Sequence, residues 1–360
     1  MATIALAGGG TGGHVYPALA IGDVLRERGH TVVYMGDPQR LEARVAPTRG
    51  YAFHPVVAPQ YPRAGLAGKI RFALGLLGAI SRSRGQLRAE KVDLVLGVGG
   101  YISAPAVLAA WTLRRPRAIH EANVVPGMAN KLCARVANLV FLTYEKTRTR
   151  LPGNAPRHVV GVPVNPAVLQ GDRAIAAARY GLDPARPIVL FVGGSLGAAR
   201  INELAVGVAR ASSEVQVLHL TGKRYHDEVT AEFEGEVPGH VSLVDYEDRM
   251  GDAYACADLA VCRAGSSTLA ELTATGTPGL LIPSPNVTEN HQEENARGLE
   301  EQGAARVLVE ANWDLSSAVE TVVSLMGAPD QLASMSEAAR AQARLDAAQQ
   351  AADLVEGLLD

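Results

Sequence analysis

The sequence predicts an α/β protein built from two doubly wound parallel sheets, each covered by helices on both faces. Short apolar runs rich in β-branched residues alternate with longer amphipathic stretches, the pattern of repeated strand–helix units. The apolar runs are nearly continuous, as in parallel strands that are buried on both faces. A length of 360 residues suggests two domains, at roughly 100–200 residues each. The pattern also restarts near residue 187, where a fresh apolar run leads into a glycine-rich turn.

Eleven apolar runs are expected to form strands. In chain order they span residues 3–7, 31–35, 93–98, 117–120, 138–143, 187–192, 215–220, 241–246, 259–263, 279–283 and 305–309. Amphipathic stretches between them are expected to form helices over 15–29, 104–114, 200–211, 267–276, 292–302 and 315–327. The alanine-rich tail from about residue 330 is also expected to be helical.

The two halves of the chain differ sharply in charge. Residues 1–163 carry a net charge of +13 and residues 164–360 a net charge of −16, and Pro163 and Pro166 mark the break. We therefore expect an N-terminal domain over 1–163, a C-terminal domain over 164–345, and a C-terminal helix over 346–360 that packs back on the N-terminal domain. The positive half predicts an anionic partner.

The composition excludes several classes of protein. With 48% apolar and 20% charged residues, the chain is neither disordered nor fibrous. Its three cysteines lack CxxC spacing, which argues against a disulfide framework or a zinc site and favours a reducing compartment. No signal-peptide pattern and no run of about 20 apolar residues is found, so we expect a cytoplasmic protein without a membrane span.

Three predicted strands lead into glycine loops, at residues 8–14, 99–105 and 193–198. Glycine lets the backbone approach a ligand, and a helix N-terminus favours an anion. The first loop also fits the dinucleotide fingerprint, with Asp37 where a ribose-binding acid would stand, so an NAD-dependent oxidoreductase is one alternative. Loops in both halves fit better with a ligand that has phosphates on both sides of a cleft between two domains.

Six motifs resemble those of one enzyme family, in the family's order: GGTGGHVYPALA (9–20), GVGGYISAP (97–105), HEANVVPGMANK (120–131), GGSLGAARIN (193–202), CRAGSSTLAE (262–271) and HQEENA (291–296). The chain resembles the glycosyltransferases of family 28 that convert lipid I to lipid II in peptidoglycan synthesis. The resemblance implies a GT-B fold of two facing Rossmann-like domains, UDP-GlcNAc as donor, and lipid I, undecaprenyl-pyrophosphoryl-MurNAc-pentapeptide, as acceptor. Three positions depart from the family pattern: Asn165 replaces an arginine, and Leu196 and Ala122 each replace a glutamine.

The resemblance also implies roles for individual residues. His14 is the candidate general base, since histidine titrates near neutral pH, with Glu121 as a second candidate; His14 holding the acceptor diphosphate instead is left open. The implied donor-binding residues are Thr11, Gly12, Gly13, Asn123, Ser195, Glu247, Arg263, Ser266, Ser267, Thr268, Leu269, Ala270, Glu271, Gln292 and Asn295. The implied acceptor-diphosphate residues are Gly10, Gly99, Gly100 and Tyr101.

The segment 61–84 mixes apolar and basic residues and is expected to lie on an anionic membrane surface. The residues expected to make this contact are Lys69, Ile70, Arg71, Phe72, Leu76, Leu77 and Arg82. A buried helix with a solvated edge is the alternative. With lipid I as acceptor, this implies a peripheral enzyme on the cytoplasmic face of the cell membrane, with other cell-wall synthesis proteins as further candidate partners.

The sequence contains no DxD triad of the kind that holds a metal in other glycosyltransferases, so we expect no metal and no other cofactor. Low aromatic content and the lack of a recognition module argue against nucleic acid as the anionic partner. A GT-B enzyme with another lipid or natural-product acceptor remains an alternative.

Overall fold

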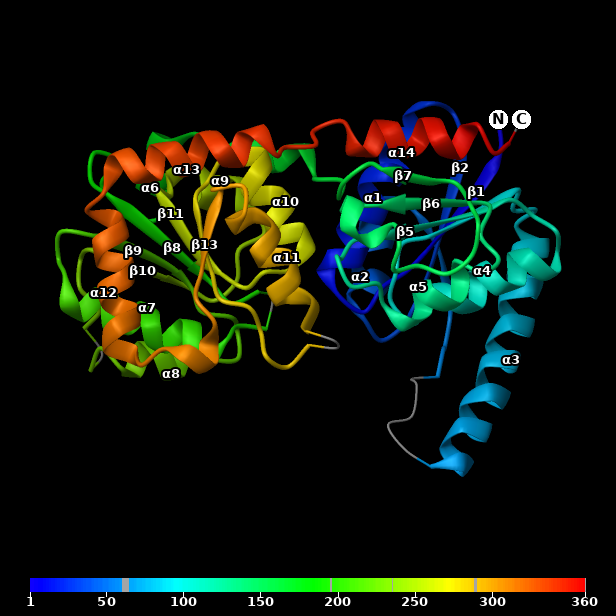
Figure 1. Cartoon of the computed structure of the whole chain (residues 1–360), viewed down its shortest axis with the longest axis horizontal. Coiled ribbons are helices and arrows are strands. Elements are labelled where there is room, and N and C mark those ends of the chain that lie inside the picture. The colour runs from blue at the N-terminus through cyan, green and yellow to red at the C-terminus, as the bar shows by residue number, and fades with distance from the viewer. Residues whose placement is uncertain (60–64, 195, 235, 288–289, 360) are drawn as a thin grey trace. The chain divides into compact units, whose positions relative to one another are not determined.

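A computed structural model describes residues 1–59, 65–194, 196–234, 236–287 and 290–359. The chain divides into two compact units (Figure 1). Unit 1 comprises Met1–Val164 together with Leu345–Asp360, and unit 2 comprises Asn165–Arg344. The boundary at 164/165 lies beside the expected one, and the last 16 residues belong to the unit that is remote from them in sequence.

Unit 1 contains a seven-stranded parallel sheet in the order β3-β2-β1-β4-β5-β6-β7. Its strands are β1 (Thr3–Ala7), β2 (Thr31–Gly36), β3 (Ala52–Pro55), β4 (Leu94–Gly97), β5 (Arg117–Glu121), β6 (Leu139–Leu142) and β7 (Arg157–Val159). Its helices are α1 (Gly12–Glu27), α2 (Leu41–Thr48), α3 (Leu66–Ala89), α4 (Ser103–Thr112), α5 (Met128–Cys133) and α14 (Ala347–Glu356).

Both faces of this sheet are buried, as its continuous apolar strands predict. Along β1, Ile4 and Leu6 pack into one apolar cluster, while Ala5 and Ala7 pack into another on the opposite face. All four side chains are fully buried. Helices therefore cover both faces, and ligands of such sheets meet the loops at the carboxyl ends of the strands.

The C-terminal helix α14 belongs to the core of unit 1. Ala351, Ala352 and Val355 are fully buried in the same cluster as Ile4 and Leu6. At its end, Glu356 accepts hydrogen bonds from Arg28 at 2.6 Å and pairs with the ring of His30 at 2.9 Å. The last helix thus ties the C-terminus to α1 and to the start of β2.

Unit 2 contains a six-stranded parallel sheet in the order β10-β9-β8-β11-β12-β13. Its strands are β8 (Ile188–Val192), β9 (Gln216–Leu220), β10 (Val241–Val244), β11 (Leu259–Cys262), β12 (Gly279–Leu281) and β13 (Ala305–Val307). Its helices are α6 (Arg173–Arg179), α7 (Ala199–Ala211), α8 (His226–Ala231), α9 (Met250–Cys256), α10 (Ser266–Thr275), α11 (His291–Glu300), α12 (Leu315–Met326) and α13 (Pro329–Ala341).

The expected strands and helices are confirmed, since each overlaps an element of its own type. Two strands were missed, β3 and β7, and both are edge strands of the first sheet. An edge strand needs little apolar character because it pairs on one side only, and here β3 ends in Pro55 while β7 has only three residues. Within the described residues, no helix combines the length and apolar character needed to cross a membrane.

Candidate active site

The first glycine loop joins β1 to α1 and places His14 in the first turn of that helix. The amide of His14 donates to the carbonyl of Thr11 at 3.1 Å, and Thr11 is the helix N-cap. Gly12 and Gly13 begin the helix, so their backbone lies where a helix N-terminus offers N–H groups to an anion. His14 itself is half-buried.

The second glycine loop, after β4, packs directly against the first. Gly99 and Gly100 both have positive φ, at 97° and 74°. A Cβ at Gly99 would lie 2.8 Å from the ring of His14, and one at Gly100 would lie 2.5 Å from the carbonyl oxygen of Gly9. Glycine is therefore required at both positions, and the absence of side chains brings this loop against the imidazole.

Glu121 is buried at the carboxyl end of β5, with a side chain that accepts several hydrogen bonds. Oε1 accepts from the backbone and side-chain nitrogens of Asn123 at 3.0 and 3.3 Å. Oε2 accepts from the Gly127 amide at 3.0 Å and from Asn130 Nδ2 at 2.9 Å. Burial raises the pKa of Glu121, and these four donors partly offset the rise. The arrangement fits a carboxylate that shapes the loop presenting Asn123.

The third glycine loop follows β8 in unit 2. Gly194 and Gly197 have φ of 86° and 75°, and a Cβ at Gly193 would lie 2.4 Å from the amide of Ala198. The side chain of Leu196, which replaces the family glutamine, is largely exposed. Ser195, a predicted donor-binding residue of this loop, lies outside the described residues.

The α10 helix begins shortly after β11 and carries six predicted donor residues, Ser266 to Glu271. Its N-cap is Gly265, which makes no side-chain capping bond. Ser266, Ser267 and Thr268 therefore stand inside the first turn and none of them is the N-cap residue, the position that Ser and Thr often take. Ser266 and Leu269 are buried, while Ser267, Thr268 and Ala270 are half-buried.

Glu271 lies one turn into α10 and is held by a tyrosine from α9. The hydroxyl of Tyr254 donates to Glu271 Oε2 at 2.8 Å. Burial raises the pKa of Glu271 to about 7, although the hydrogen bond from Tyr254 lowers it in part. A carboxyl group that changes charge near neutral pH at the predicted ribose position is the type of perturbed group found at functional sites.

Glu247 follows β10, and its side chain is tied into unit 2. It accepts from the Tyr180 hydroxyl at 2.8 Å, from Arg179 at 3.0 Å and from the Arg249 amide at 2.6 Å. Burial raises the pKa of Glu247, but the three donors together lower it by more, so the net shift of the pKa is downward. With the side chain occupied in this way, the backbone is the part of Glu247 that is left to contact a donor.

The remaining predicted donor residues of unit 2 differ in exposure. Arg263 spans from the end of β11 to the carbonyls of Ile282 and Pro283 and to Glu310 at 2.6 Å, so it braces neighbouring loops. Gln292 is half-buried, and its side-chain oxygen accepts from the amide of Ser284 at 2.9 Å. Asn295, one turn further along α11, is fully buried.

Asn165, which stands where the family has arginine, has a structural role in this chain. Its side-chain oxygen accepts from the amide of Ala167 at 3.1 Å and caps a short 3-10 helix, Pro166–Leu169.

His120, in β5, forms a hydrogen bond through its ring with the carbonyl of Gly161 at 2.8 Å. Burial lowers the pKa of His120 to about 4, so this histidine is neutral at physiological pH.

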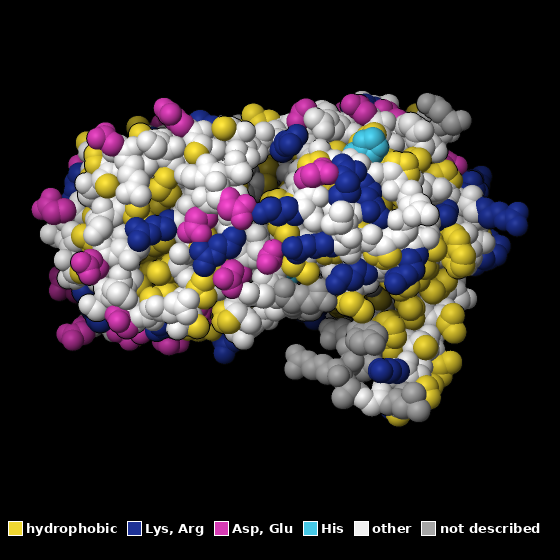
Figure 2. Space-filling view, in the orientation of Figure 1, with side chains coloured by type: hydrophobic (Ala, Val, Ile, Leu, Met, Phe, Trp, Pro, Cys, Tyr) yellow, Lys and Arg dark blue, Asp and Glu magenta, His cyan; other side chains and the backbone are white. Residues whose placement is uncertain are grey.

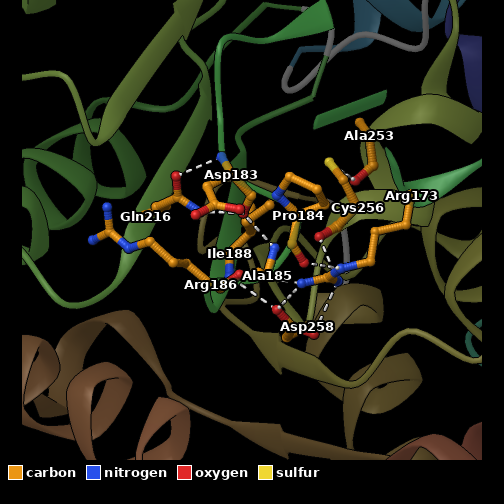
Figure 3. Close-up of polar contacts among 10 residues, drawn as sticks. All are labelled: Arg173, Asp183, Pro184, Ala185, Arg186, Ile188, Gln216, Ala253, Cys256 and Asp258. Carbon is orange, nitrogen blue, oxygen red and sulfur yellow. Dashed lines mark hydrogen bonds and ion pairs between the residues drawn. The ribbon is translucent and has the colours of Figure 1, made fainter. Parts of the chain in front are cut away.

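A cavity of about 690 Å³ lies in unit 2 at the amino ends of the strands, at the opposite end of the sheet from the third glycine loop, and is lined by Pro187, Asp258 and Pro278 among others. One wall is the guanidinium of Arg173, which pairs with both carboxylate oxygens of Asp258 and also donates to the carbonyls of Cys256, Pro184 and Arg186 (Figure 3). All five N–H groups of Arg173 are thereby used. Arg173 therefore joins the ends of β8 and β11 and has no donor left for a ligand.

The surface of α3 carries the residues predicted to meet a membrane. Figure 2 shows hydrophobic side chains gathered along this helix with basic side chains among them. Ile70, Leu74 and Leu77 follow each other at helical spacing and are 54%, 65% and 63% exposed. Lys69, Arg71 and Arg82 are exposed as well, whereas Phe72 and Leu76 are half-buried. Leu74, which also lies in the predicted segment 61–84, belongs to this surface, and residues 61–64 of that segment lie outside the described part of the chain.

Sequence reasoning missed three polar residues that organise the site: Glu42, Asn130 and Tyr254. Each acts on a predicted site residue rather than on a ligand, through the bonds to Gly10, Glu121 and Glu271. Asn130 lies in a recognised motif, ten residues after His120, and was open to detection. No described group of three or more His, Cys, Asp or Glu residues is arranged to hold a metal ion.

Both units of the chain match known proteins. The family model for the glycosyltransferase family 28 N-terminal domain matches residues 4–142, and that for the C-terminal domain matches residues 188–351. A protein of Salinibacter ruber is 41% identical over 99% of this chain and 97% of its own length, and one of Geobacter metallireducens is 39% identical over 96% and 95%. Both are named UDP-N-acetylglucosamine--N-acetylmuramyl-(pentapeptide) pyrophosphoryl-undecaprenol N-acetylglucosamine transferase.

Solved structures also match this chain over nearly its whole length. The crystal structure of Acinetobacter baumannii MurG matches with a TM-score of 0.79 at 27% identity, covering 99% of this chain and all of that one. The glycotransferase of kitacinnamycin shares the fold, with a TM-score of 0.73 at 19% identity over 100% of this chain and 99% of its own. The two Rossmann-like units form a GT-B fold, and the chain belongs to glycosyltransferase family 28.

Proposed function

We propose that this protein transfers GlcNAc from UDP-GlcNAc to the C4 hydroxyl of the MurNAc unit of lipid I and so produces lipid II. The observation that carries the proposal is the match to relatives named for this transfer, at up to 41% identity over nearly the whole of both chains. The family models for the N-terminal and C-terminal domains both match as well, which supports the proposal.

The proposed reaction is a direct displacement with inversion. The C4 oxygen of MurNAc bonds to the anomeric carbon of GlcNAc while the bond from that carbon to the β-phosphate oxygen of UDP breaks. His14 takes the proton of the attacking hydroxyl, and UDP leaves with the bonding electron pair. The packing of the His14 ring against Gly99 supports this role because it fixes the imidazole at the acceptor loops.

Charge that develops on the leaving diphosphate needs stabilisation in the donor site. The first turn of α10, Ser266 to Thr268, offers backbone N–H groups and hydroxyls there, and the third glycine loop offers its backbone. Glu271 would accept hydrogen bonds from both ribose hydroxyls. We propose that no metal ion takes part, and transfer that persists after treatment with a chelator would support this.

We also propose that α3 binds the cytoplasmic leaflet of the cell membrane, where lipid I is anchored. The exposed apolar row of Ile70, Leu74 and Leu77, next to exposed Lys69 and Arg71, supports this. An apolar face with flanking cations suits a helix that lies in the interface of an anionic membrane.

The acceptor assignment is tested with lipid I and an analogue in which hydrogen replaces the C4 hydroxyl of MurNAc. Radiolabelled UDP-GlcNAc is incubated with vesicles containing either lipid, and label in the lipid fraction is counted. We expect transfer to lipid I and none to the analogue, with a β-configured product by NMR. Transfer to the analogue would show that another hydroxyl is attacked.

A further inference from the structure

Glu42 is a fully buried carboxylate in the first turn of α2, directly behind the first glycine loop. Both of its oxygens accept from the amide of Gly10 at 3.2 Å, and Oε1 also accepts from the amide of Asp37 at 3.1 Å. Gly10 belongs to the loop after β1, whereas Asp37 directly follows β2. One buried side chain thus joins the carboxyl ends of two neighbouring strands.

The backbone on both sides is shaped to admit this side chain. A Cβ at Gly9 would overlap the carboxylate of Glu42, and a Cβ at Gly36 would lie 2.5 Å from its Cγ. Glycine at these two positions, one in the first glycine loop and one at the end of β2, is therefore explained by the presence of Glu42. The first glycine loop and the carboxylate of Glu42 are therefore packed directly against each other.

The contacts of Glu42 extend through Asp37 to the second glycine loop. The carboxylate of Asp37 accepts from the hydroxyl of Tyr101 at 3.2 Å, and Tyr101 directly follows Gly99 and Gly100. Gly100 in turn lies against the carbonyl of Gly9, and Gly99 lies against the ring of His14. Glu42 consequently connects, through backbone and one tyrosine, to both the first and the second glycine loop.

We infer that Glu42 is a positioning residue that holds the two glycine loops in the arrangement that places the His14 ring for proton transfer. This inference rests on the proposed role of His14. The amide of Gly10 donates to the Glu42 carboxylate and so is already paired with an anion of the protein itself. Gly10 therefore contributes to the predicted acceptor site through its backbone conformation, with φ of 89°. A carboxylate suits the position because it accepts from both amides at once and carries no donor.

Glu42→Gln keeps the shape of the side chain but places an NH2 group among two N–H donors. A buried donor left without an acceptor costs enough to shift the loop, so we expect kcat for transfer to fall about ten- to hundredfold. The KM for UDP-GlcNAc should change less than kcat, because most of the predicted donor-binding residues lie in unit 2 and only Thr11, Gly12 and Gly13 lie in the first glycine loop. Asp93→Asn is the matched control, because Asp93 also accepts a backbone amide of β1, that of Thr3 at 2.9 Å, at the opposite end of the strand.

The position of the ring is read independently of activity by NMR of histidine-labelled protein without ligand. The His14 signals are assigned by their loss in His14→Ala. We expect them to move in Glu42→Gln and to stay in place in Asp93→Asn. Tyr101→Phe provides a second test if Glu42→Gln does not fold, and it should move the same signals with a smaller loss of kcat.

Two results would overturn the inference. One is a Glu42→Gln variant whose kcat and His14 signals match those of Asp93→Asn. The other, where Glu42→Gln does not fold, is unchanged His14 signals in Tyr101→Phe. If the wild-type protein transferred nothing to lipid I, the proposed function would fail, while the NMR comparison would still decide whether Glu42 positions the ring.

Discussion

The hydroxyl of Tyr254 donates a 2.8 Å hydrogen bond to Glu271, whose carboxyl group has a pKa raised to about 7 by burial. Tyr254 is itself buried, so the pair couples the interior of unit 2 to the predicted ribose site. A carboxylate accepts hydrogen bonds from both ribose hydroxyls only when it is ionised. Donor binding should therefore depend on the charge of Glu271.

Affinity for UDP-GlcNAc should rise as the pH increases through 7. The free protein holds a proton on Glu271 below this pH and must release it to bind, so affinity falls by up to about tenfold per pH unit below 7 and is level above it. Isothermal titration calorimetry between pH 5.5 and 8.5 measures this. Glu271→Gln should bind more weakly with no such step, and a step that persists in this variant would contradict the assignment.

Tyr254→Phe should move the step to higher pH. The tyrosine hydroxyl stabilises the ionised carboxyl group, so its loss raises the pKa of Glu271 further. The same titration measures the shift. An unchanged midpoint would mean that Tyr254 supports only the packing of α9 against α10.

His14→Ala should lower the rate of transfer to lipid I by about 10²- to 10⁴-fold, the usual contribution of a general base. Binding of UDP should remain close to that of the wild-type protein, because most of the predicted donor-binding residues lie in unit 2 and His14 is not among them. A radiolabel assay and calorimetry measure the two quantities. If His14 holds the acceptor diphosphate instead, the KM for lipid I will rise while kcat changes little.

Charge reversal on α3 should weaken membrane binding. Each basic residue near an anionic surface contributes about 1 kcal/mol, so Lys69→Glu, Arg71→Glu and Arg82→Glu together should greatly reduce sedimentation with anionic vesicles. Exposed Arg210, Arg306 and Arg344, in unit 2, provide a matched control with three charge reversals. Equal sedimentation of both variants would show that α3 is not the contact surface.

Loss of apolar volume in α14 should destabilise unit 1. Val355 is fully buried in the core shared with α1, so Val355→Ala should lower the free energy of unfolding by about 2 kcal/mol. Chemical denaturation measures the change. The exposed Asp353 of the same helix provides a control, since Asp353→Ala removes only a surface ion pair with Arg28 and should cost less than about 1 kcal/mol.

The strands and the glycine loops were predictable because both depend on local sequence. A continuous apolar run such as residues 187–192 forms a buried parallel strand, and the turn after it needs glycines at positive φ, as at Gly194 and Gly197. The edge strands β3 and β7 lacked that signal because they are short and only partly apolar.

The supporting contacts of the site were not predictable in the same way. Glu42 stands 32 residues from Gly10, and Tyr254 stands 17 residues from Glu271, on separate elements. Only the folded arrangement of parallel strands brings these residues together. From the sequence alone, a glutamate at the start of a short helix is explained as a favourable charge at a helix N-terminus. The resemblance to family 28 named the residues expected to touch substrates, whereas the structure adds those that hold them in place.

The most direct test of the proposed function is the transfer of label from UDP-GlcNAc into lipid I in anionic vesicles, with UDP binding measured on the same preparation. We predict that label enters the lipid fraction, that the labelled lipid is lipid II, and that transfer depends on His14. Tight binding of UDP without any transfer to lipid I would contradict the proposed acceptor, and the search would turn to another lipid or natural product.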